Sequence, residues 1–333
     1  MSFEIPLGAM RFNSDSQKLE YWMGSAWMQI QTLSPNVNGG TRGVYAKGTQ
    51  PGGDTNLIQF ITISTAGDAA DFGDAPTAST SEVLGGVASN TRGVFAGGYS
   101  NPAHLNLIEF VTIAQQGNSQ DFGDLIAGGH GGQGVSNQTR GIFVIGNNAP
   151  GFSATNRMDF ITIASTGNAV RFGEIFGQNG ARQNCGSVAS PTRMLIGGGG
   201  FPNVLSGIDY CTITTQGDFQ DFGDLVVASR SQSGAHNSTR GIFTGGGPPN
   251  AVNVMEYVQI ATLGNATNYG DLAASDGGGR MASMSSRTRG VLSTGSNVLS
   301  MCSLVTSGNT VDFGDAVNVR SSQRGSSNAH GGL

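Results

Sequence analysis

The chain has 333 residues, of which 12% are charged and 54 are glycine, and its formal net charge is −5. The negative charge and the presence of only two lysines, Lys18 and Lys47, argue against a nucleic-acid-binding protein, because counterion release from a phosphate backbone needs clustered cations. No run approaches the roughly 20 apolar residues of a membrane span, and no basic segment precedes an apolar run at the start, so the sequence predicts neither membrane insertion nor a signal peptide.

The N-terminal segment 11–30, RFNSDSQKLEYWMGSAWMQI, predicts three short strands with turns at 14–15 and 24–25. Both tryptophans of the chain, Trp22 and Trp27, lie in it. So few residues, without a disulfide or a metal, cannot bury both faces of a sheet. We therefore expect residues 1–33 to form a separate β module whose tryptophans bury against a partner, either the rest of the chain, a second copy or another protein.

The remainder, 34–333, contains a repeat of about 50 residues: NLIEFVTIAQQGNSQDFGDL at 106–125 has close counterparts at 56–75 and 156–175. Three landmarks recur six times: a Thr-Arg pair, a Gly-Asn or Gly-Asp pair and an aromatic-Gly-acid triplet. The arginines are Arg42, Arg92, Arg140, Arg193, Arg240 and Arg289, and the triplet acids are Asp74, Asp124, Glu174, Asp224, Asp271 and Asp315. Such a period is typical of propeller blades.

Each repeat reads as four strands, which we label a to d. In the second copy they are GGVASN (85–90), RGVFAGG (92–98), LIEFVTIA (107–114) and QDFGDL (120–125), with a hairpin signal at 117–118 between c and d. Strand c carries apolar residues on both faces, as expected for a sheet between two neighbours. No segment of useful length shows a helical period, so the chain is predicted to be all-β.

The spacing of the landmarks separates a constant edge from a varied one. The turn glycine and the triplet glycine are six residues apart in every copy, whereas the b–c and d–a connections change length. In an antiparallel sheet the b–c and d–a connections lie at the same edge, and variation at one edge of a repeat array is typical of a binding face. Because the first copy lacks a strand a, we expect the C-terminal segment 324–333 to supply it and to close a ring of six blades.

A residue repeated in every copy is expected to hold the sheets together. We therefore expect the six arginines to bind main-chain carbonyls or the triplet acids, and we interpret the strand c acids in the same way. Cys185, Cys211 and Cys302 are predicted to be structural thiols. These acids and cysteines form no recognisable catalytic set, and the four single histidines are expected to be solvated, so the sequence predicts no metal, no cofactor and no enzyme. The strand c acids are Glu109, Asp159, Asp209 and Glu256, and the histidines are His104, His130, His236 and His330.

The candidate ligand-binding residues lie in the varied connections. Rings that stack on apolar faces, with guanidinium and imidazole groups that bind hydroxyls, suit a surface that recognises a sugar or a protein. These candidates are Tyr99, His104, Phe152, Arg157, Phe176, Arg182, Phe201 and Arg230.

The double glycine after strand b and the aromatic residues of strands c and d resemble kelch repeats, over roughly residues 40–333, with phenylalanine at most of the usual Tyr and Trp positions. The sequence pattern IEFVTIA…GN…DFGDL…TRGVFAGG is similar to that of kelch-like virion proteins of tailed bacteriophages. Residues 8–30, with Arg-Phe-Asn, Lys-Leu-Glu-Tyr and Gly-x-x-Trp, resemble a short β module of phage tail-fibre proteins.

This resemblance implies a virion structural protein of the tail or fibre class, made in the host cytoplasm. The N-terminal module would bind other virion proteins or form a homo-oligomer, and the varied face of a six-bladed kelch-like propeller would bind a host surface glycan or protein. One alternative is a purely architectural capsid or tail protein whose varied face docks other virion subunits. The third hypothesis is a glycan-active enzyme. It would need a pair of acids or a metal site on the varied face, whereas the sequence offers only the isolated acids Asp54, Glu82 and Asp276 there.

Overall fold

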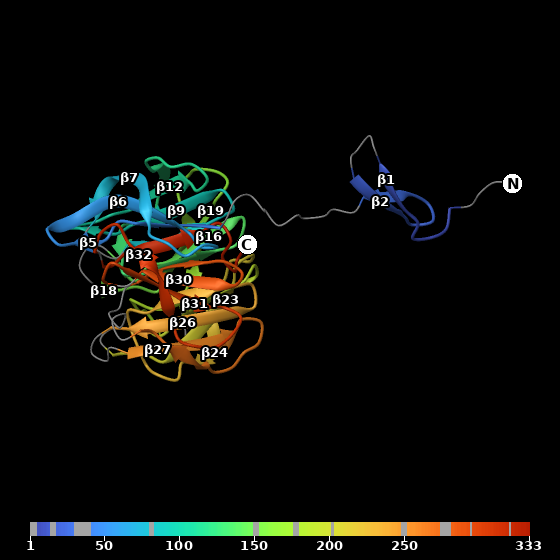
Figure 1. Cartoon of the computed structure of the whole chain (residues 1–333). Helices are drawn as coiled ribbons and strands as arrows, with labels where there is room; N and C mark the ends of the chain where they lie inside the picture. The colour runs from blue at the N-terminus through green and yellow to red at the C-terminus, as the bar shows by residue number, and fades with distance from the viewer. Residues whose placement is uncertain are drawn as a thin grey trace. The chain divides into compact units, whose positions relative to one another are not determined.

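The computed structural model is all-β: the described residues form strands, turns and loops, as the sequence predicts (Figure 1). The chain divides into two compact units, Met1–Gly40 and Thr41–Leu333, called here the N-terminal module and the repeat domain. Among the described residues, no helix is long and apolar enough to cross a membrane. The structure describes residues 5–13, 18–29, 41–79, 83–148, 153–175, 180–200, 203–247, 252–273, 281–293, 295–319 and 321–333.

The N-terminal module contains one antiparallel sheet in the order β1-β2-β3. Its strands are β1 (Met10–Asn13), β2 (Lys18–Trp22) and β3 (Trp27–Gln29). The three predicted strands are therefore confirmed. The predicted turn at 14–15 lies outside the described residues, and the turn at 24–25 contains Gly24 with a φ of 92°.

The repeat domain contains antiparallel sheets that follow the repeats of the sequence, each running a-b-c-d in hydrogen-bonded order. Repeat 2 is β8 (Leu84–Ala88), β9 (Arg92–Ala96), β12 (Leu107–Thr112) and β13 (Gln120–Asp124); repeat 3 is β15 (Gln133–Ser136), β16 (Arg140–Val144), β19 (Arg157–Thr162) and β20 (Val170–Glu174); repeat 4 is β21 (Gly186–Ala189), β22 (Arg193–Gly197), β23 (Gly207–Thr212) and β24 (Gln220–Asp224). Repeat 5 is β25 (Ser233–His236), β26 (Arg240–Gly246), β27 (Val252–Gln259) and β28 (Thr267–Asp271); repeat 6 is β29 (Ala282–Ser285), β30 (Arg289–Ser293), β31 (Val298–Ser303) and β32 (Val311–Asp315).

The first repeat is completed by the end of the chain. Its strands are β4 (Arg42–Ala46), β6 (Gly53–Thr62) and β7 (Ala70–Ser79), with β33 (Arg324–Ser327) as strand a. β33 pairs antiparallel with β4, with Ser327 opposite Gly43 and Arg324 opposite Ala46. The predicted pairing of the C-terminal segment with the first copy is confirmed.

Short extra strands lie in the varied connections. β5 (Thr49–Gln50) pairs with β6, and β10 (Tyr99–Ser100) pairs with β11 (Ala103–His104). A small sheet combines β14 (Gly129–His130), β17 (Asn147–Asn148) and β18 (Ser153–Ala154). It joins the d–a connection after repeat 2 to the b–c connection of repeat 3, so these two kinds of connection do meet at one edge.

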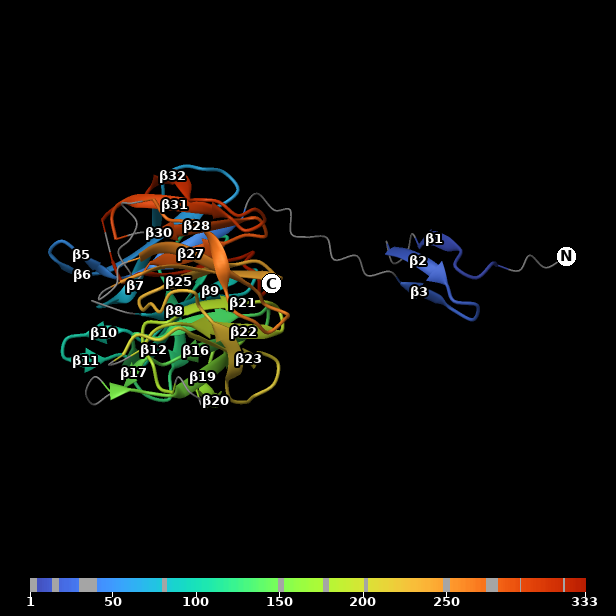
Figure 2. The same cartoon turned by 90° about the horizontal axis from the view of Figure 1, so that it is seen from below.

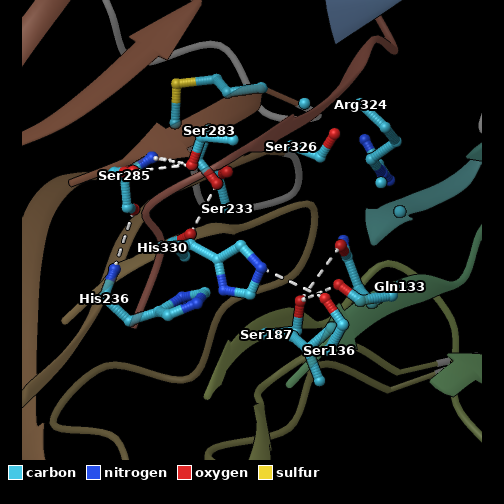
Figure 3. A pocket seen from close by; sticks show the side chains of 18 residues that line it. Gln133, Ser136, Ser187, Ser233, His236, Ser283, Ser285, Arg324, Ser326 and His330 are labelled. Carbon is cyan, nitrogen blue, oxygen red and sulfur yellow. Dashed lines mark hydrogen bonds between the residues drawn. The ribbon is translucent and has the colours of Figure 1, made fainter. Parts of the chain in front are cut away.

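The strands a of successive repeats lie against one another. β8 contacts β15, β15 contacts β21, β21 contacts β25, β25 contacts β29, β29 contacts β33, and β33 contacts β8; β21 and β25 can be found in Figure 2. All six of these strands contribute residues to one cavity (Figure 3), called here the inner-strand cavity. The small side chains expected for crowded strands are present in it, mostly glycine and serine.

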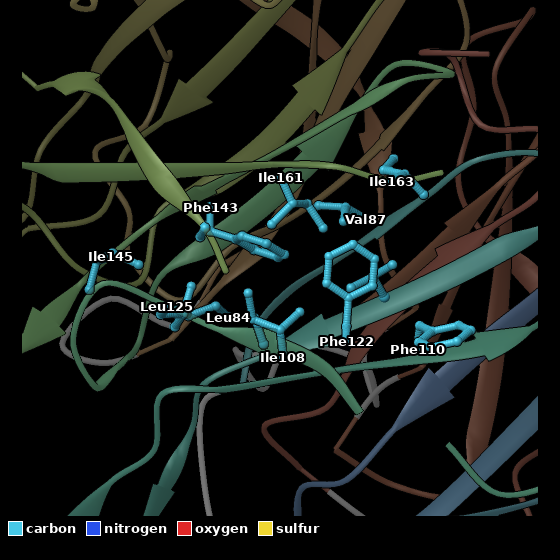
Figure 4. Packing of buried hydrophobic residues seen from close by; sticks show 13 residues of the cluster. Leu84, Val87, Ile108, Phe110, Phe122, Leu125, Phe143, Ile145, Ile161 and Ile163 are labelled. Atoms are coloured by element: carbon cyan, nitrogen blue, oxygen red, sulfur yellow. The ribbon is translucent and has the colours of Figure 1, made fainter. Parts of the chain in front are cut away.

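The apolar cores lie between repeats rather than within them. The cluster in Figure 4 combines Leu84, Ile108 and Phe122 of repeat 2 with Phe143 and Ile161 of repeat 3. Four further clusters join repeats 1 and 2, 3 and 4, 4 and 5, and 5 and 6, and another joins repeat 6 to repeat 1. Each sheet thus buries both faces, which explains why both sides of strand c are apolar.

The repeated arginines form the first kind of joint between repeats. Each donates from Nη1 to a main-chain carbonyl at or just after the end of strand c in the next repeat: Arg42 to Ile113 at 2.9 Å, for example, and Arg140 to Ile213 at 2.8 Å. Arg92, Arg193 and Arg289 make the equivalent bonds to Ile163, Ile260 and Ile63, and Arg240 bonds the carbonyl one residue further along, that of Val305. Of the two partners that the sequence left open, the carbonyls are the ones observed.

Five of these guanidinium groups also cover the strand c aromatic ring of their own repeat; in repeat 6 the corresponding strand c residue is Met301. The distance from Cζ to the ring centroid is 4.5 Å for Arg42 over Phe60 and 5.2 Å for Arg240 over Tyr257, within the range of cation–π contacts. Arg92, Arg140 and Arg193 lie in the same way over Phe110, Phe160 and Tyr210. One arginine therefore contacts two adjacent repeats, which explains why its position recurs in every copy.

The c–d turns form the second kind of joint. Gly117 N donates to Phe72 O at 2.8 Å, and the Asn118 side chain accepts from Asp74 N at 3.0 Å. The c–d turn of repeat 2 is therefore hydrogen-bonded to strand d of repeat 1. The turn of repeat 1 contacts strand d of repeat 6 in the same manner, through Gly67 N to Phe313 O at 2.8 Å. The triplet acids thus contribute to this contact between repeats through their main-chain N–H groups.

Candidate functional site

An aromatic and polar cluster occupies the varied edge where repeats 2 and 3 meet. Tyr99 and His104 face each other across the β10–β11 hairpin, with ring centroids 5.3 Å apart, and His130 of β14 lies 5.5 Å from Tyr99 and 4.7 Å from His104. Gly98 N donates to Gly129 O at 2.9 Å and fixes the hairpin to β14. The two histidines, 26 residues apart in sequence, are therefore held together by main-chain pairing.

A hydrogen bond joins the two imidazoles of this cluster. The Nδ1 atoms of His104 and His130 are 2.9 Å apart, so one imidazole donates a proton and the other accepts it. Asn147 Nδ2 is 3.4 Å from His130 Nε2 and also contacts Gln183 Oε1, while no described group donates to the buried Asn147 Oδ1. Imidazole, amide and phenol groups here provide both donors and acceptors at one edge.

A hollow lies next to β17. It has a volume of about 470 Å³ and is lined by Asn148, Ser153, Thr155 and Asn156, with Ile175 and Ala181 supplying apolar contacts. This volume is in the range of small-molecule sites, and hydroxyl and amide groups suit an uncharged polar ligand. Asn147 of the cluster and Asn148 of the hollow are consecutive residues of β17, and we call the cluster and the hollow together the loop-edge site.

The structure brings some of the predicted ligand-binding residues together and separates others. Tyr99 and His104 form the cluster. Arg230 is half-buried at a different point of the varied edge, between β24 and β25. Three predicted residues lie outside the described residues: Phe152, Phe176 and Phe201.

The placement of two predicted ligand-binding arginines on an open surface was wrong. Arg157 is the first residue of β19 rather than a loop residue; it is buried, 3.2 Å from Asp159, and it donates to Ala127 O at 2.7 Å. Arg182 is in a connection but fully buried, and it pairs with Asp209. Both side chains compensate buried strand c acids, because an uncompensated buried charge is strongly destabilising.

The strand c acids have an equivalent internal role in other repeats. Glu109 pairs with Lys47, and Glu256 accepts from the main-chain N–H groups of Val226 and Val227, each at 2.9 Å. Burial raises the pKa of Glu109, Asp159 and Glu256 above their ordinary values, although Lys47 and Arg157 oppose this shift in the first two. These buried acids belong to the joints between repeats.

The expectation that the histidines are solvated was wrong for three of the four. His130, His236 and His330 are buried, and His130 belongs to the loop-edge site. Sequence reasoning missed His130 and Asn147 because they do not recur in the repeat. The one available signal was their position in the connections whose lengths vary.

In the described part of the chain, no group of three or more His, Cys, Asp or Glu residues is placed to hold a metal ion. The three cysteines are buried, and burial raises the pKa of Cys302 to about 12, so they are unreactive thiols at neutral pH. No known protein family matches the sequence. No curated protein matches it either.

Proposed function

We propose that residues 41–333 form a six-bladed β-propeller of the kelch-like kind, closed by β33. Three observations support this proposal. Each strand a contacts the strand a of the next repeat, and β33 of repeat 1 contacts both β29 of repeat 6 and β8 of repeat 2. The apolar clusters join consecutive repeats, and one of them joins repeat 6 to repeat 1. Arg289 of repeat 6 donates to the Ile63 carbonyl of repeat 1. A closed array of blades leaves only short, protected sheet edges.

We propose that the varied edge of this propeller binds a glycan on a host surface, with the loop-edge site as the contact. The observation that carries this proposal is the uncharged hollow of about 470 Å³ at β17, the strand whose Asn147 contacts His130 of the Tyr99–His104–His130 cluster. Sugars offer hydroxyls to amide, hydroxyl and imidazole groups and present apolar ring faces to aromatic side chains. The described residues that line the hollow carry no charge, which favours a neutral sugar.

We further propose that the N-terminal module attaches the chain to a virion. Cross-strand pairs place Met10, Phe12, Leu19, Tyr21 and Met28 on one face of its sheet, with 36% to 66% of each residue exposed. The opposite face holds the half-buried pair Trp22 and Trp27, 5.5 Å apart, with Arg11 4.2 Å above the Trp27 ring. A continuous apolar face on so small a sheet is typical of an interface.

The glycan proposal is tested with the full chain on an array of neutral and charged bacterial surface glycans. Tyr99→Ala and Asn148→Ala should each weaken binding at least tenfold, because they remove the stacking ring and an amide of the hollow. Gln115→Ala, an exposed residue at the constant c–d edge, is the matched control and should bind normally. If no glycan binds and the chain instead binds isolated virion subunits through the same two residues, the architectural alternative is correct.

The attachment proposal is tested by deleting residues 1–33. Particles assembled with the shortened chain should lack it, while the shortened chain should retain glycan binding. Normal incorporation of the shortened chain would place the attachment elsewhere.

A further inference from the structure

The residues that follow β33, 328–333, form a segment called here the C-terminal strap. In repeats 2 to 6 strand a leads directly into strand b, whereas strand b of repeat 1 is β4, from the other end of the repeat domain. The strap therefore does not continue the sheet to which β33 belongs. Its residues 330–332 are nonetheless buried, which indicates that the strap is held against other repeats.

His330 fastens the strap through a neutral imidazole. The residue is 7% exposed, and its Nδ1 accepts from Gly332 N at 3.1 Å. A main-chain N–H is always a donor, so Nδ1 carries no proton and the ring proton is on Nε2. Nε2 lies 3.1 Å from Ala88 O of repeat 2 and 3.2 Å from Ser136 Oγ of repeat 3 (Figure 3). Both sides of the ring thus depend on one tautomer of the uncharged form.

Two glycines bring the main chain of the strap against further repeats. A Cβ at Gly332 would clash with Ser136 O, and a Cβ at Gly331 would clash with Asn237 O, in the a–b turn of repeat 5, and lie 2.8 Å from Ala189 O of repeat 4. The strap therefore touches repeats 2 to 5. Glycine supplies no side chain, and in the described part of the chain the side-chain hydrogen bonds from the strap to these repeats are those of His330.

The surroundings of His330 disfavour a positive charge on its ring. Of the described residues that line the inner-strand cavity with it, His236 and Arg324 have titratable or charged side chains. The His236 ring is 5.5 Å from that of His330, and the strap itself carries the α-carboxylate of Leu333, which stays ionised to about pH 4. Burial lowers the pKa of His330 to about 4, although the Ala88 carbonyl opposes this shift.

We propose that the C-terminal strap is an acid-sensitive fastening, released from repeats 2 to 5 by protonation of His330 while the sheets of the repeat domain stay folded. A solvent proton on Nδ1 would face the Gly332 N–H, so the hydrogen bond that orients the ring is lost and two donors oppose each other. After release, water solvates the imidazolium and the ends of the inner strands are uncovered. This proposal is independent of the glycan site and of virion attachment.

The direction and size of the effect follow from linkage. The pKa of His330 is about 4 in the attached strap and 6.5, the ordinary value, in a released one. Attachment is therefore strongest above pH 6.5, weakens as the pH falls and loses the whole contribution of His330 below pH 4. The ratio of released to attached strap should rise on the order of 100-fold over this range.

The test is hydrogen exchange of the full chain, followed by mass spectrometry between pH 4.5 and 7 and corrected for the intrinsic effect of pH on exchange. A peptide that covers the strap should exchange at least tenfold faster at pH 4.5 than at pH 7, because local opening controls exchange. A peptide that covers β19, a buried strand c, is the internal control and should keep its protection.

Two variants assign the effect to His330. His330→Gln should remove the pH dependence of strap exchange, because an amide does not titrate in this range. His104→Gln, which removes a histidine outside the strap, is the matched control and should keep the dependence of the wild type. The proposal is overturned if strap exchange in the wild type does not accelerate, if it accelerates together with β19, or if His330→Gln keeps the full pH dependence. The first two outcomes need only the wild-type chain.

Discussion

The guanidinium of Arg289 donates a hydrogen bond to the main-chain carbonyl of Ile63, 226 positions earlier in the chain, at a distance of 3.2 Å. The same group donates to Ser64 O at 2.8 Å. The equivalent arginines of the other repeats make the same bond over separations of 65 to 73 positions. The contact between repeats 6 and 1 is thus made by the same chemistry as the contacts between consecutive repeats.

Deleting residues 320–333 should lower the melting temperature sharply or abolish folding. The deletion removes β33, leaves the edge of β4 unpaired and removes the contacts of β33 with β8 and β29. Circular dichroism during heating measures the effect, and a chain lacking residues 1–33 serves as the comparison. If the C-terminally shortened chain melts at the temperature of the full chain, β33 does not complete the first repeat.

Arg140→Ala should destabilise the protein by about 1–3 kcal/mol. The substitution removes the hydrogen bond to Ile213 O and the contact over Phe160, and it leaves a half-buried carbonyl without its donor. Urea unfolding gives the free energy, with Arg171→Ala as the control. Because the Arg171 side chain is 44% exposed in its pair with Glu174, its loss should change stability by no more than about 0.5 kcal/mol. Equal losses of stability at the two positions would contradict the assignment of Arg140 as a stabilising contact between repeats 3 and 4.

Gly123→Ala should destabilise the protein more than Gly117→Ala. Both glycines have a positive φ, 144° and 156°, so both substitutions strain the backbone similarly. A Cβ at residue 123 would lie 2.5 Å from Gly167 O in the next repeat, whereas a Cβ at residue 117 would meet nothing within 4 Å. Thermal unfolding of the two variants isolates the steric term, and an equal loss at both sites would show that the close approach between repeats tolerates a methyl group.

The contribution of His330 to the stability of the protein should be lost as the pH decreases from about 6.5 to about 4, against the opposite contribution of the buried acids whose pKa is raised. Burial lowers the pKa of His330 from 6.5 to about 4, so between these values the unfolded chain binds a proton that the folded chain does not. The loss attributable to His330 is roughly 3 kcal/mol, complete below pH 4. His236, whose pKa is also lowered by burial and by His330, acts in the same direction.

The measurement is the urea unfolding free energy of the wild type and of His330→Gln between pH 4 and 8, at one fixed chloride concentration. The variant should lose less stability on acidification than the wild type, so that the difference between them narrows toward pH 4. Parallel pH profiles would mean that His330 does not titrate differently in the folded and unfolded states.

The repeated landmarks allowed the strands and their partners to be predicted well. Each landmark is a local requirement that recurs: a turn glycine, an aromatic ring on strand c and an arginine at the start of strand b. The sequence left two classes of partner open for the arginine, because a carbonyl at the end of a strand carries no side-chain signal. Only the packing of one repeat against the next decides that Ile213 O, and not an acid, accepts from Arg140.

The candidate site was harder to predict because its residues do not recur. Tyr99 and His104 were found from their position in a varied connection, but His130 and Asn147 come from two other connections, and only pairing between β14 and β17 brings them to the first two. Arg157 was misplaced although a signal existed. Asp159 follows it by two positions on a strand, so both side chains face the same way.

The first sheet has a consequence for how the protein is made. Synthesis proceeds from the N-terminus at about 5–20 residues per second, so β33 leaves the ribosome on the order of tens of seconds after β4. Throughout that interval the nascent chain carries an unpaired strand edge that another nascent chain on the same messenger can occupy. A ribosome that stops anywhere before residue 324 therefore releases a chain with an open sheet rather than a slightly shorter copy of the folded one.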